Sequence, residues 1–537
     1  MKQYITILFS ILIGATLFTS CESLTDVSPE EVLLSDDYLG DDKLDARSAL
    51  FGVISQMQDI TEQYIVLGEI RADLVDVTSN AGDEIRQINT HNINLENSYV
   101  DPKTLFSIIN NCNFALAGID TEAYDNLLLD DYASILRIRT WSQMQILINY
   151  GKLPYITDPI QNEDDLTKKY PLLSFEQGID QLIENLQAVT GVDNVTDYEN
   201  SLGFSIFNMI PNQDVLLGDL NLWKGNFPLA AMHYKQFLDD NVSGASNFYN
   251  LTSLYGVTTT ESSGAYTTDN NWDDIFQETI QNSEVINYIS YSEQFRQENN
   301  GFVVFGNQIK PSSQAIFLWD EQLKGFNKQP YESGDNRASV SYTGISDMAR
   351  ITKYQYDYFT WNRVAKIYLR YAEAINYAGY PYHALTIVNG IFNDPNTLPQ
   401  MALIFNNTED FLNFDVNQYY VTNSSDVPTS GNLGVRGRVS MAPVFIDSNV
   451  SNEEAIKLAG ELILNEMALE LAFEGNRWED LVRFSKRANN PVIISEAVAQ
   501  KFETSGDASS AAKVRAILMN PENWYLPLTL PENFVSD

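Results

Sequence analysis

The 537-residue sequence is poor in cysteine, histidine and basic residues, and each shortage argues against a class of protein. Two cysteines are too few for a disulfide framework. The 33 Lys and Arg residues face 72 Asp and Glu residues, which gives a net charge of -39. This balance argues against a nucleic-acid-binding protein, which needs basic surface to displace counterions from phosphates. Hydrophobic residues make up 44% of the chain, enough for a large buried core.

Sequence signatures of catalysis are also missing. The chain contains no GxSxG, GxGxxG, Walker or HExxH motif. Its three histidines lie far apart, and no loop has the spacing of calcium ligands. We therefore predict no catalytic residue, no metal and no cofactor. A glycosidase needs only two carboxylates at a set separation, so a surface glycoside hydrolase stays open as an alternative.

The one long apolar run, Ile5 to Phe18, is shorter than the roughly 20 residues of a membrane-spanning helix. Lys2 precedes it, and the small residues Thr19 and Ser20 follow it directly before Cys21. This order resembles a bacterial lipoprotein signal, in which the cysteine is acylated and becomes the new N-terminus. An ordinary secretory leader with an incidental Cys21 is the alternative.

Helical patterns dominate the first half of the sequence. Apolar residues recur at helical spacing over residues 44–60, and again around Cys112, which lies on an apolar stripe. Ser174 and Gln177 form a capping-box pattern at the start of another helix, and Gly151 predicts the end of the preceding one.

Two stretches share the spacing of a tetratricopeptide helical pair. They are "DVLLGDLNLWKGNFPLAAMHYKQFL" and "IYLRYAEAINYAGYPYHALTIVNGIF". The turn glycines Gly225 and Gly379 precede the small residues Ala230 and Ala384 by the same interval, and a small residue lets two helices approach closely. Degenerate pairs follow "NNCNFALAGID" and begin at "EEAIKLAG". The fold class predicted is mainly α, with about four tetratricopeptide-like helical pairs.

Three regions lack this helical pattern. Residues 79–100 show no sustained period and predict a loop, as do residues from 395 to about 449. Residues 241–352 are rich in Ser, Thr, Gly, Asn and Tyr, and "GFVVFG" and "AIFLWD" within them predict short strands. The mainly α fold should therefore carry a loop-rich, partly β region.

Charged residues are densest in "ELAFEGNRWEDLVRF". The acids and bases at three- and four-residue spacing are Glu470, Glu474, Arg477, Asp480 and Arg483. On one helix they would form a structural salt-bridge motif that locks the helix against its neighbours. Arg436 and Arg438 in "GVRGR" are expected to bind carbonyl groups or acids elsewhere in the fold.

The ordered succession of the lipoprotein leader, "INNCNFALAGI", "LINYGKLPYITDPI", "LLGDLNLWKGNFPLAAMHYKQFL", "LELAFEGNRWEDLVRF" and "NWYLPL" resembles the SusD/RagB family of outer-membrane nutrient-binding lipoproteins. One departure is Met467 after Glu466, where the family often has Arg. The resemblance implies a surface-exposed lipoprotein on a TonB-dependent, SusC-like β-barrel transporter. Such a protein captures an oligosaccharide, or in some members a peptide, and does no chemistry on it.

On this basis we predict a signal peptide (1–20), an acidic tether (21–40), an N-terminal helical region (41–240), a loop-rich insertion (241–352) and a C-terminal helical region (353–537), in one compact body. A sugar presents a C–H face and a rim of hydroxyls, which aromatic rings and polar side chains recognise. From their loop positions, the predicted ligand-binding residues are His91, Tyr99, Tyr266, Trp272, Tyr331 and Arg337. Simple packing or exposure is the alternative for each, and a scaffold that only docks partner proteins is a further functional alternative.

Overall fold

The computed structural model describes residues 43–122, 126–193, 206–241, 251, 272–276, 282–291, 306–324, 332–355, 358–390, 409–413, 434–439 and 441–536. The predicted leader, Cys21, Tyr266 and Tyr331 lie outside these residues, as does most of "GFVVFG". None of the described helices is both long and apolar enough to cross a bilayer.

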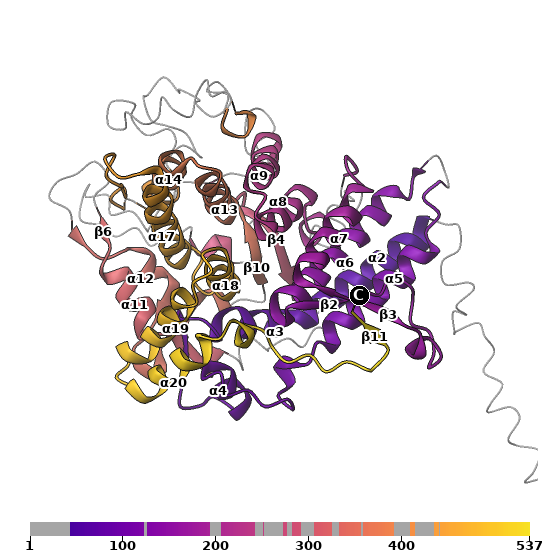
Figure 1. The fold of residues 1–537 in the computed structure, drawn as a ribbon, viewed down its shortest axis with the longest axis horizontal. Helices are drawn as coiled ribbons and strands as arrows, with labels where there is room; N and C mark the ends of the chain where they lie inside the picture. The colour runs from indigo at the N-terminus through magenta and orange to yellow at the C-terminus, as the bar shows by residue number, and fades with distance from the viewer. Residues whose placement is uncertain are drawn as a thin grey trace, which may run out of the picture.

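The fold is mainly α, as the sequence predicts, and its helices pack as antiparallel neighbours (Figure 1). The paired helices are α5 (Lys103–Gly118) with α6 (Leu129–Tyr150), α8 (Gln213–Lys224) with α9 (Phe227–Asn241), α13 (Val364–Tyr377) with α14 (Pro381–Asn389), and α19 (Val492–Thr504) with α20 (Ala508–Leu518). Helix α17 (Asn452–Glu470) packs on α13 and α14, and a turn connects it to α18 (Arg477–Arg487). Helices α2 (Lys43–Met57) and α7 (Phe175–Gln187) pack against α6.

Several local signals in the sequence are confirmed. Gly151 and Gly225 adopt left-handed φ values of 75° and 82° at the ends of α6 and α8. Ser174 and Gln177 form the reciprocal capping box of α7. Cys112 is a free, fully buried thiol on α5. Turn and cap residues act within a few positions of the chain, so the sequence identifies them directly.

Two predictions about local structure are wrong. "AIFLWD" forms helix α11 (Ser313–Asp320), because the Ser312 hydroxyl accepts the backbone N–H of Ala315 and caps it. Part of the segment 79–100 forms helix α4 (Asp83–Asn89), whose buried residues are Ile85, Ile88 and Asn89. Both segments are short, and tertiary burial decides their structure.

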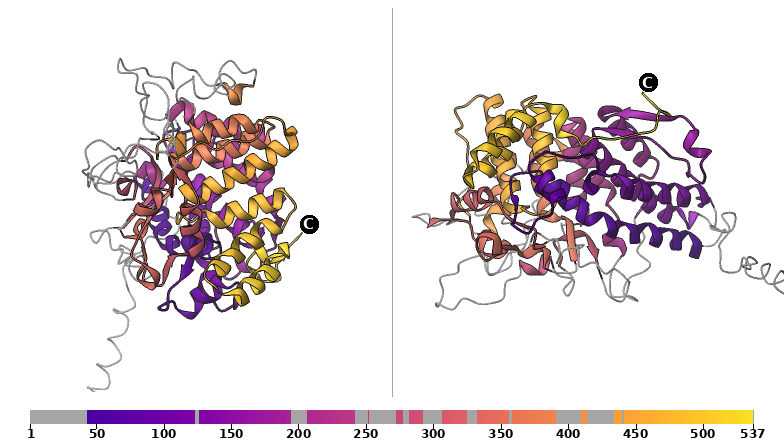
Figure 2. Two further views of the ribbon diagram at one scale, coloured as in Figure 1. Left: turned by 90° about the vertical axis from the view of Figure 1, so that its left-hand side faces the viewer. Right: turned by 90° about the horizontal axis from the view of Figure 1, so that it is seen from below.

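The strands are short and pair across long sequence distances. Antiparallel pairs join β1 (Val75–Val77) to β5 (Ile309–Pro311), β4 (Val285–Ser290) to β10 (Tyr358–Arg363), β6 (Leu323–Lys324) to β7 (Glu332–Ser333), and β8 (Tyr342–Thr343) to β9 (Arg350–Ile351). Strand β3 (Tyr170–Ser174) lies between β2 (Lys152–Pro154) and the C-terminal β11 (Phe534–Val535). The elements between β4 and β10 gather on one side of the body, opposite α17 to α20 (Figure 2).

The largest hydrophobic cluster runs from Ala46 to Leu526 and joins both ends of the described chain in one core. A second cluster fills the space among α8, α9, α13, α14 and α17. Within it, the fully buried Ala230 and Ala384 allow the close approach that the repeat spacing predicts.

Close packing of α8 on α9 predicts the effect of a single methyl group. A Cβ at Gly218 would lie 2.6 Å from Cε1 of Tyr234, so Gly218→Ala should lower the free energy of unfolding by about 1–3 kcal/mol. Gly52→Ala on α2 is the matched control, because its Cβ would meet no atom within 4 Å. Denaturant unfolding of both variants provides the measurement. Equal free energies of unfolding in Gly218→Ala and Gly52→Ala would contradict the packing described here.

Candidate functional site

A buried ion network lies beneath the side of the molecule that carries the short strands. It consists of five carboxylates and five cations, so it is formally neutral: Glu284, Asp335, Glu466, Glu470 and Glu474 with Arg337, Lys353, Arg363, Arg436 and Arg438. All ten side chains are at most 3% exposed. Buried charges are tolerated only when they are paired and hydrogen-bonded.

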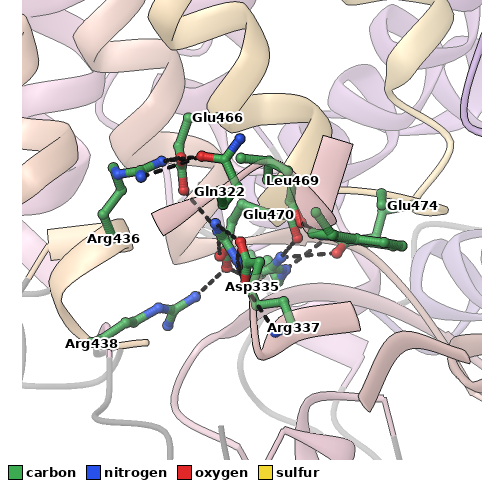
Figure 3. Close-up of polar contacts among 12 residues, drawn as sticks. Gln322, Asp335, Arg337, Arg436, Arg438, Glu466, Leu469, Glu470 and Glu474 are labelled. Carbon is green, nitrogen blue, oxygen red and sulfur yellow. Dashed lines mark hydrogen bonds and ion pairs between the residues drawn. The ribbon is translucent and has the colours of Figure 1, made fainter. Parts of the chain in front are cut away.

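Glu470, the last residue of α17, lies at the centre of the buried ion network (Figure 3). Its carboxylate accepts from Arg337 Nη1 at 2.7 Å and Arg363 Nη1 at 2.8 Å, and it also pairs with Arg438. Burial alone would raise the pKa of Glu470, but the guanidinium groups of Arg438, Arg363 and Arg337 hold it well below its usual range. Glu470 therefore stays ionised inside the protein.

The network joins the strand-bearing segments to the C-terminal helices. Arg337 begins the short helix α12 (Arg337–Ser341), and Arg363 ends β10. Arg436 lies on α16 (Gly434–Gly437), where it pairs with Glu466 and donates to the Ala442 carbonyl at 2.9 Å. The partners expected for Arg436 and Arg438, acids and carbonyls elsewhere in the fold, are thus observed. Through these bonds the network fixes β4, β10 and α12 on α16 and α17.

The five residues of the structural salt-bridge motif are all buried, but they do not share one continuous helix. A turn over residues 471–476 separates Glu470, at the end of α17, from α18. Glu474 lies within this turn, where Phe473 and Gly475 adopt φ values of 73° and 83°. These left-handed residues interrupt the helix, and Gly475 packs closely on Gly68 and Tyr64. Glu470, Glu474 and Arg477 therefore pair only with charged residues on other segments, whereas Asp480 and Arg483 also pair with each other.

Most partners of this motif come from distant parts of the chain. Arg477 forms a bidentate pair with Asp73 at 2.7 and 2.8 Å, and Arg483 binds Glu373 at 2.8 and 2.9 Å. Arg483 also bonds Asp480 at 2.6 Å. Burial would raise the pKa of Glu373, but Arg483 and Arg487 lower it to about 2.

The residues around Glu69 dock the first half of the chain onto α18. The Glu69 carboxyl accepts the backbone N–H groups of Gly475 and Asn476 at 2.7 and 3.0 Å, at the start of α18. Burial raises the pKa of Glu69 to about 8, although its hydrogen bonds from backbone N–H groups act in the opposite direction. Arg71 lies over the Trp478 ring and donates to Asn149 Oδ1 at 3.0 Å.

Lys501 of α19 binds the chain on both sides of the turn 78–82. Its ammonium donates to the carbonyls of Ile70, Ala72 and Val75 and to Asn89 Oδ1, at 2.7–3.2 Å. Val75 begins β1 and Asn89 ends α4. The ammonium therefore fixes both ends of the β1–α4 unit, whose tip is the exposed turn 78–82.

Three turns meet at this tip, and we call residues 78–82, 306–310 and 344–350 the loop junction. Asp347 accepts the backbone N–H of Ser79 at 3.1 Å and pairs with Lys310 at 2.7 Å. The hydrogen bonds from Lys310 and Ser79 lower the pKa of Asp347 to about 2. Gln308 Oε1 accepts the N–H of Gly82 at 2.8 Å. Side chains thus add to the β1–β5 pairing and the backbone bond from Thr78 to the Gln308 carbonyl in holding the three turns together.

The loop junction exposes both amide and apolar groups. Asn80 and Asn307 are exposed, and Ile345 and Met348 are 73% and 71% exposed. Among the described residues, these two are the most exposed large apolar side chains. The sequence analysis did not identify these residues, because β1 and β5 meet from positions more than 230 residues apart.

The ligand-binding residues predicted from sequence lie apart from this junction. Trp272 is fully buried between Phe276 and the cations Lys353 and Arg363, and Arg337 is fully buried in the ion network. Neither offers surface to a ligand in this structure, so the site we propose does not include them.

His91 and Tyr99 are half-buried, and both make internal contacts. The His91 ring packs on Trp478 and its Nε2 bonds the Arg71 carbonyl at 2.8 Å. Desolvation, together with Arg71 and Lys501, lowers the pKa of His91 to about 3. The Tyr99 hydroxyl donates to Glu62 at 2.6 Å. A ligand role for these two residues stays a prediction.

Interior space offers no alternative site for a sugar in the region of α6, α8 and β10. The cavity there, lined by Trp141, Asn212, Trp361 and Lys366 among others, has a volume of about 10 Å³, room for roughly one water molecule. Among the residues described, no group of three His, Cys, Asp or Glu side chains could hold a metal ion. This cavity is therefore too small for a sugar.

The depressed carboxylate pKa values predict how stability depends on pH. A group with a lowered folded pKa stabilises the fold above its unfolded pKa and loses that contribution as pH falls through the folded value. Stability should therefore fall between about pH 4.5 and pH 2, with on the order of 3 kcal/mol from Glu373 alone. Thermal unfolding across this range tests it. Glu373→Gln should flatten the profile and the exposed Glu461→Gln should not; identical profiles would contradict the ion-pair account.

Comparison with known proteins identifies the fold. Residues 418–531 match the model of the SusD family. A SusD superfamily protein from Bacteroides vulgatus superposes with a TM-score of 0.58 at 14% identity, covering 90% of this chain and 95% of the other. A SusD homolog from Bacteroides thetaiotaomicron gives a TM-score of 0.56 at 14% identity, covering 89% and 93%. A structure described as a laminarin-binding SusD-like protein gives 0.53 at 15% identity, covering 88% and 98%.

A sequence search of curated proteins found no match. The evidence for relationship is the C-terminal family match together with the SusD superfamily fold of the body. On these two findings, residues 418–531 are similar to the SusD family, and the described body has the fold of SusD superfamily structures.

Proposed function

We propose that this protein is a non-catalytic, surface-exposed lipoprotein of the outer membrane that captures an oligosaccharide and delivers it to a TonB-dependent, SusC-like transporter. The observation that carries the proposal is the SusD family match of residues 418–531 on a body with the SusD superfamily fold. The lipoprotein-like leader ending at Cys21 supplies the anchor in this proposal. A relative of the same fold is described as laminarin-binding, which supports a glycan as the ligand class.

The loop junction is the place we propose for ligand binding. Its exposed amides on Asn80 and Asn307 can donate to and accept from sugar hydroxyls, and Ile345 and Met348 can cover the C–H face of a ring. The hydrogen bonds of Asp347 and Gln308 hold the three turns in place before a ligand arrives. A preformed site loses less conformational entropy when it binds.

The arrangement of carboxylates supports binding without turnover. A glycosidase places two carboxyl groups on either side of a scissile bond that reaches them from solvent. The clustered carboxylates of the ion network are instead buried and paired with arginine or lysine. None of these groups can approach a sugar without breaking the core.

Substitution at the loop junction tests the proposal. In calorimetric titration of the soluble chain with a panel of oligosaccharides, Asn80→Ala and Ile345→Ala should each weaken binding by about tenfold, or ~1.4 kcal/mol. Leu166→Ala is the matched control, since Leu166 is 56% exposed on the separate helix η6 (Asp165–Thr167). Unchanged affinity in both junction variants would place the site elsewhere. Shortening of the glycan during incubation would contradict a non-catalytic role.

A further inference from the structure

The basic residues of this acidic chain are largely used inside the fold. The whole chain has 33 Lys and Arg residues, and 15 of them are buried in the part that the structure describes. It has 72 Asp and Glu residues, and 13 of them are buried there. The other 18 basic and 59 acidic residues are half-buried, exposed or outside the described residues. Folding therefore removes cations from the surface in far greater proportion than anions, which makes the outside of the protein more acidic than the composition alone indicates.

The bases within and next to the loop junction already have partners. Lys310 pairs with Asp347 at 2.7 Å, which neutralises both charges. Arg350 donates to Asn307 Oδ1 at 3.1 Å and to the carbonyls of Asp347 and Ala349 at 2.9 and 2.8 Å. Arg86 is used in the same way, by the carbonyls of Thr78, Ser79 and Ala81 at 2.9–3.1 Å. These cations shape the turns, and the N–H groups named here are engaged within the protein.

The loop-rich stretches of the sequence contain few further cations. Residues 241–305 contain one basic residue, Arg296, and residues 391–433 contain none. Recognition of carboxylate or sulfate groups relies on Arg or Lys, most strongly in bidentate geometry. A polyanion would in addition be repelled by the acidic surface over a Debye length of about 8 Å at physiological salt.

We infer that the ligand captured at the loop junction is an uncharged glycan, not one bearing uronate or sulfate groups. The exposed groups at the junction are amides, hydroxyls and aliphatic side chains, which match the hydroxyl rim and C–H face of a neutral sugar. The inference rests on the proposed function, and it adds the chemical class of the glycan.

A matched pair of ligands tests the inference. The probes are a panel of neutral oligosaccharides and the same panel after oxidation of the primary alcohols to carboxylates, titrated into the soluble chain at low and high salt. We expect a neutral member to bind with an affinity that changes less than about twofold with salt, because no charge is involved. Its oxidised form should bind at least about tenfold more weakly at low salt and recover partly at high salt.

The outcomes separate the two proposals. Binding of oxidised but not neutral glycans, with affinity that falls as salt rises, would overturn the inference while leaving glycan capture intact. Binding of neither panel would overturn the proposed function itself.

Two lysine variants sharpen the test. Ser79→Lys places a cation at the junction without removing a proposed ligand contact and should raise affinity for the oxidised ligand several-fold. Ser509→Lys adds the same charge on an exposed position of α20 and should not. Equal gains in the two variants would show that net charge alone, and not the junction, sets the preference.

Discussion

The buried ion network around Glu470 is the interaction on which the arrangement of this protein depends. Ten ionisable side chains lie at most 3% exposed, and each is paired with a group of opposite formal charge. The loss of one partner would leave an uncompensated charge in the interior. Such a network stabilises one arrangement of its elements strongly and any shifted arrangement poorly. Short, irregular surface segments need this, because they have few backbone hydrogen bonds to hold them in place.

The same principle operates at the contact between the two ends of the chain. Glu69, Arg71 and Asp73 bind α18 and its preceding turn, and Lys501 binds the carbonyls that follow. These residues lead directly into β1 and so to the loop junction. The helical pairs thus act as a frame, and the buried charges transmit the rigidity of the frame to turns that have little sheet structure of their own.

The parts of this fold that depend on residues close together in the sequence could be predicted from the sequence. The turn glycines Gly151 and Gly225, the capping box of Ser174 and the pairs around Ala230 and Ala384 all follow from local spacing. The partners of Glu470 and Arg477 do not, because they come from segments 30 to more than 400 residues away. The motif correctly indicated buried salt bridges, but its regular spacing wrongly suggested one continuous helix. The loop junction escaped prediction for the same reason, since its three turns are joined only by tertiary contacts.

The central claim is that the ion network fastens the strand-bearing side to the helical frame. Hydrogen exchange of Glu470→Gln, compared with Glu461→Gln on the exposed face of α17, tests it most directly. The account predicts faster exchange in residues 306–311 and 337–363 of the Glu470 variant, while the α5–α6 and α8–α9 pairs keep their protection. Uniform acceleration across the chain, or no change in those two segments, would contradict it.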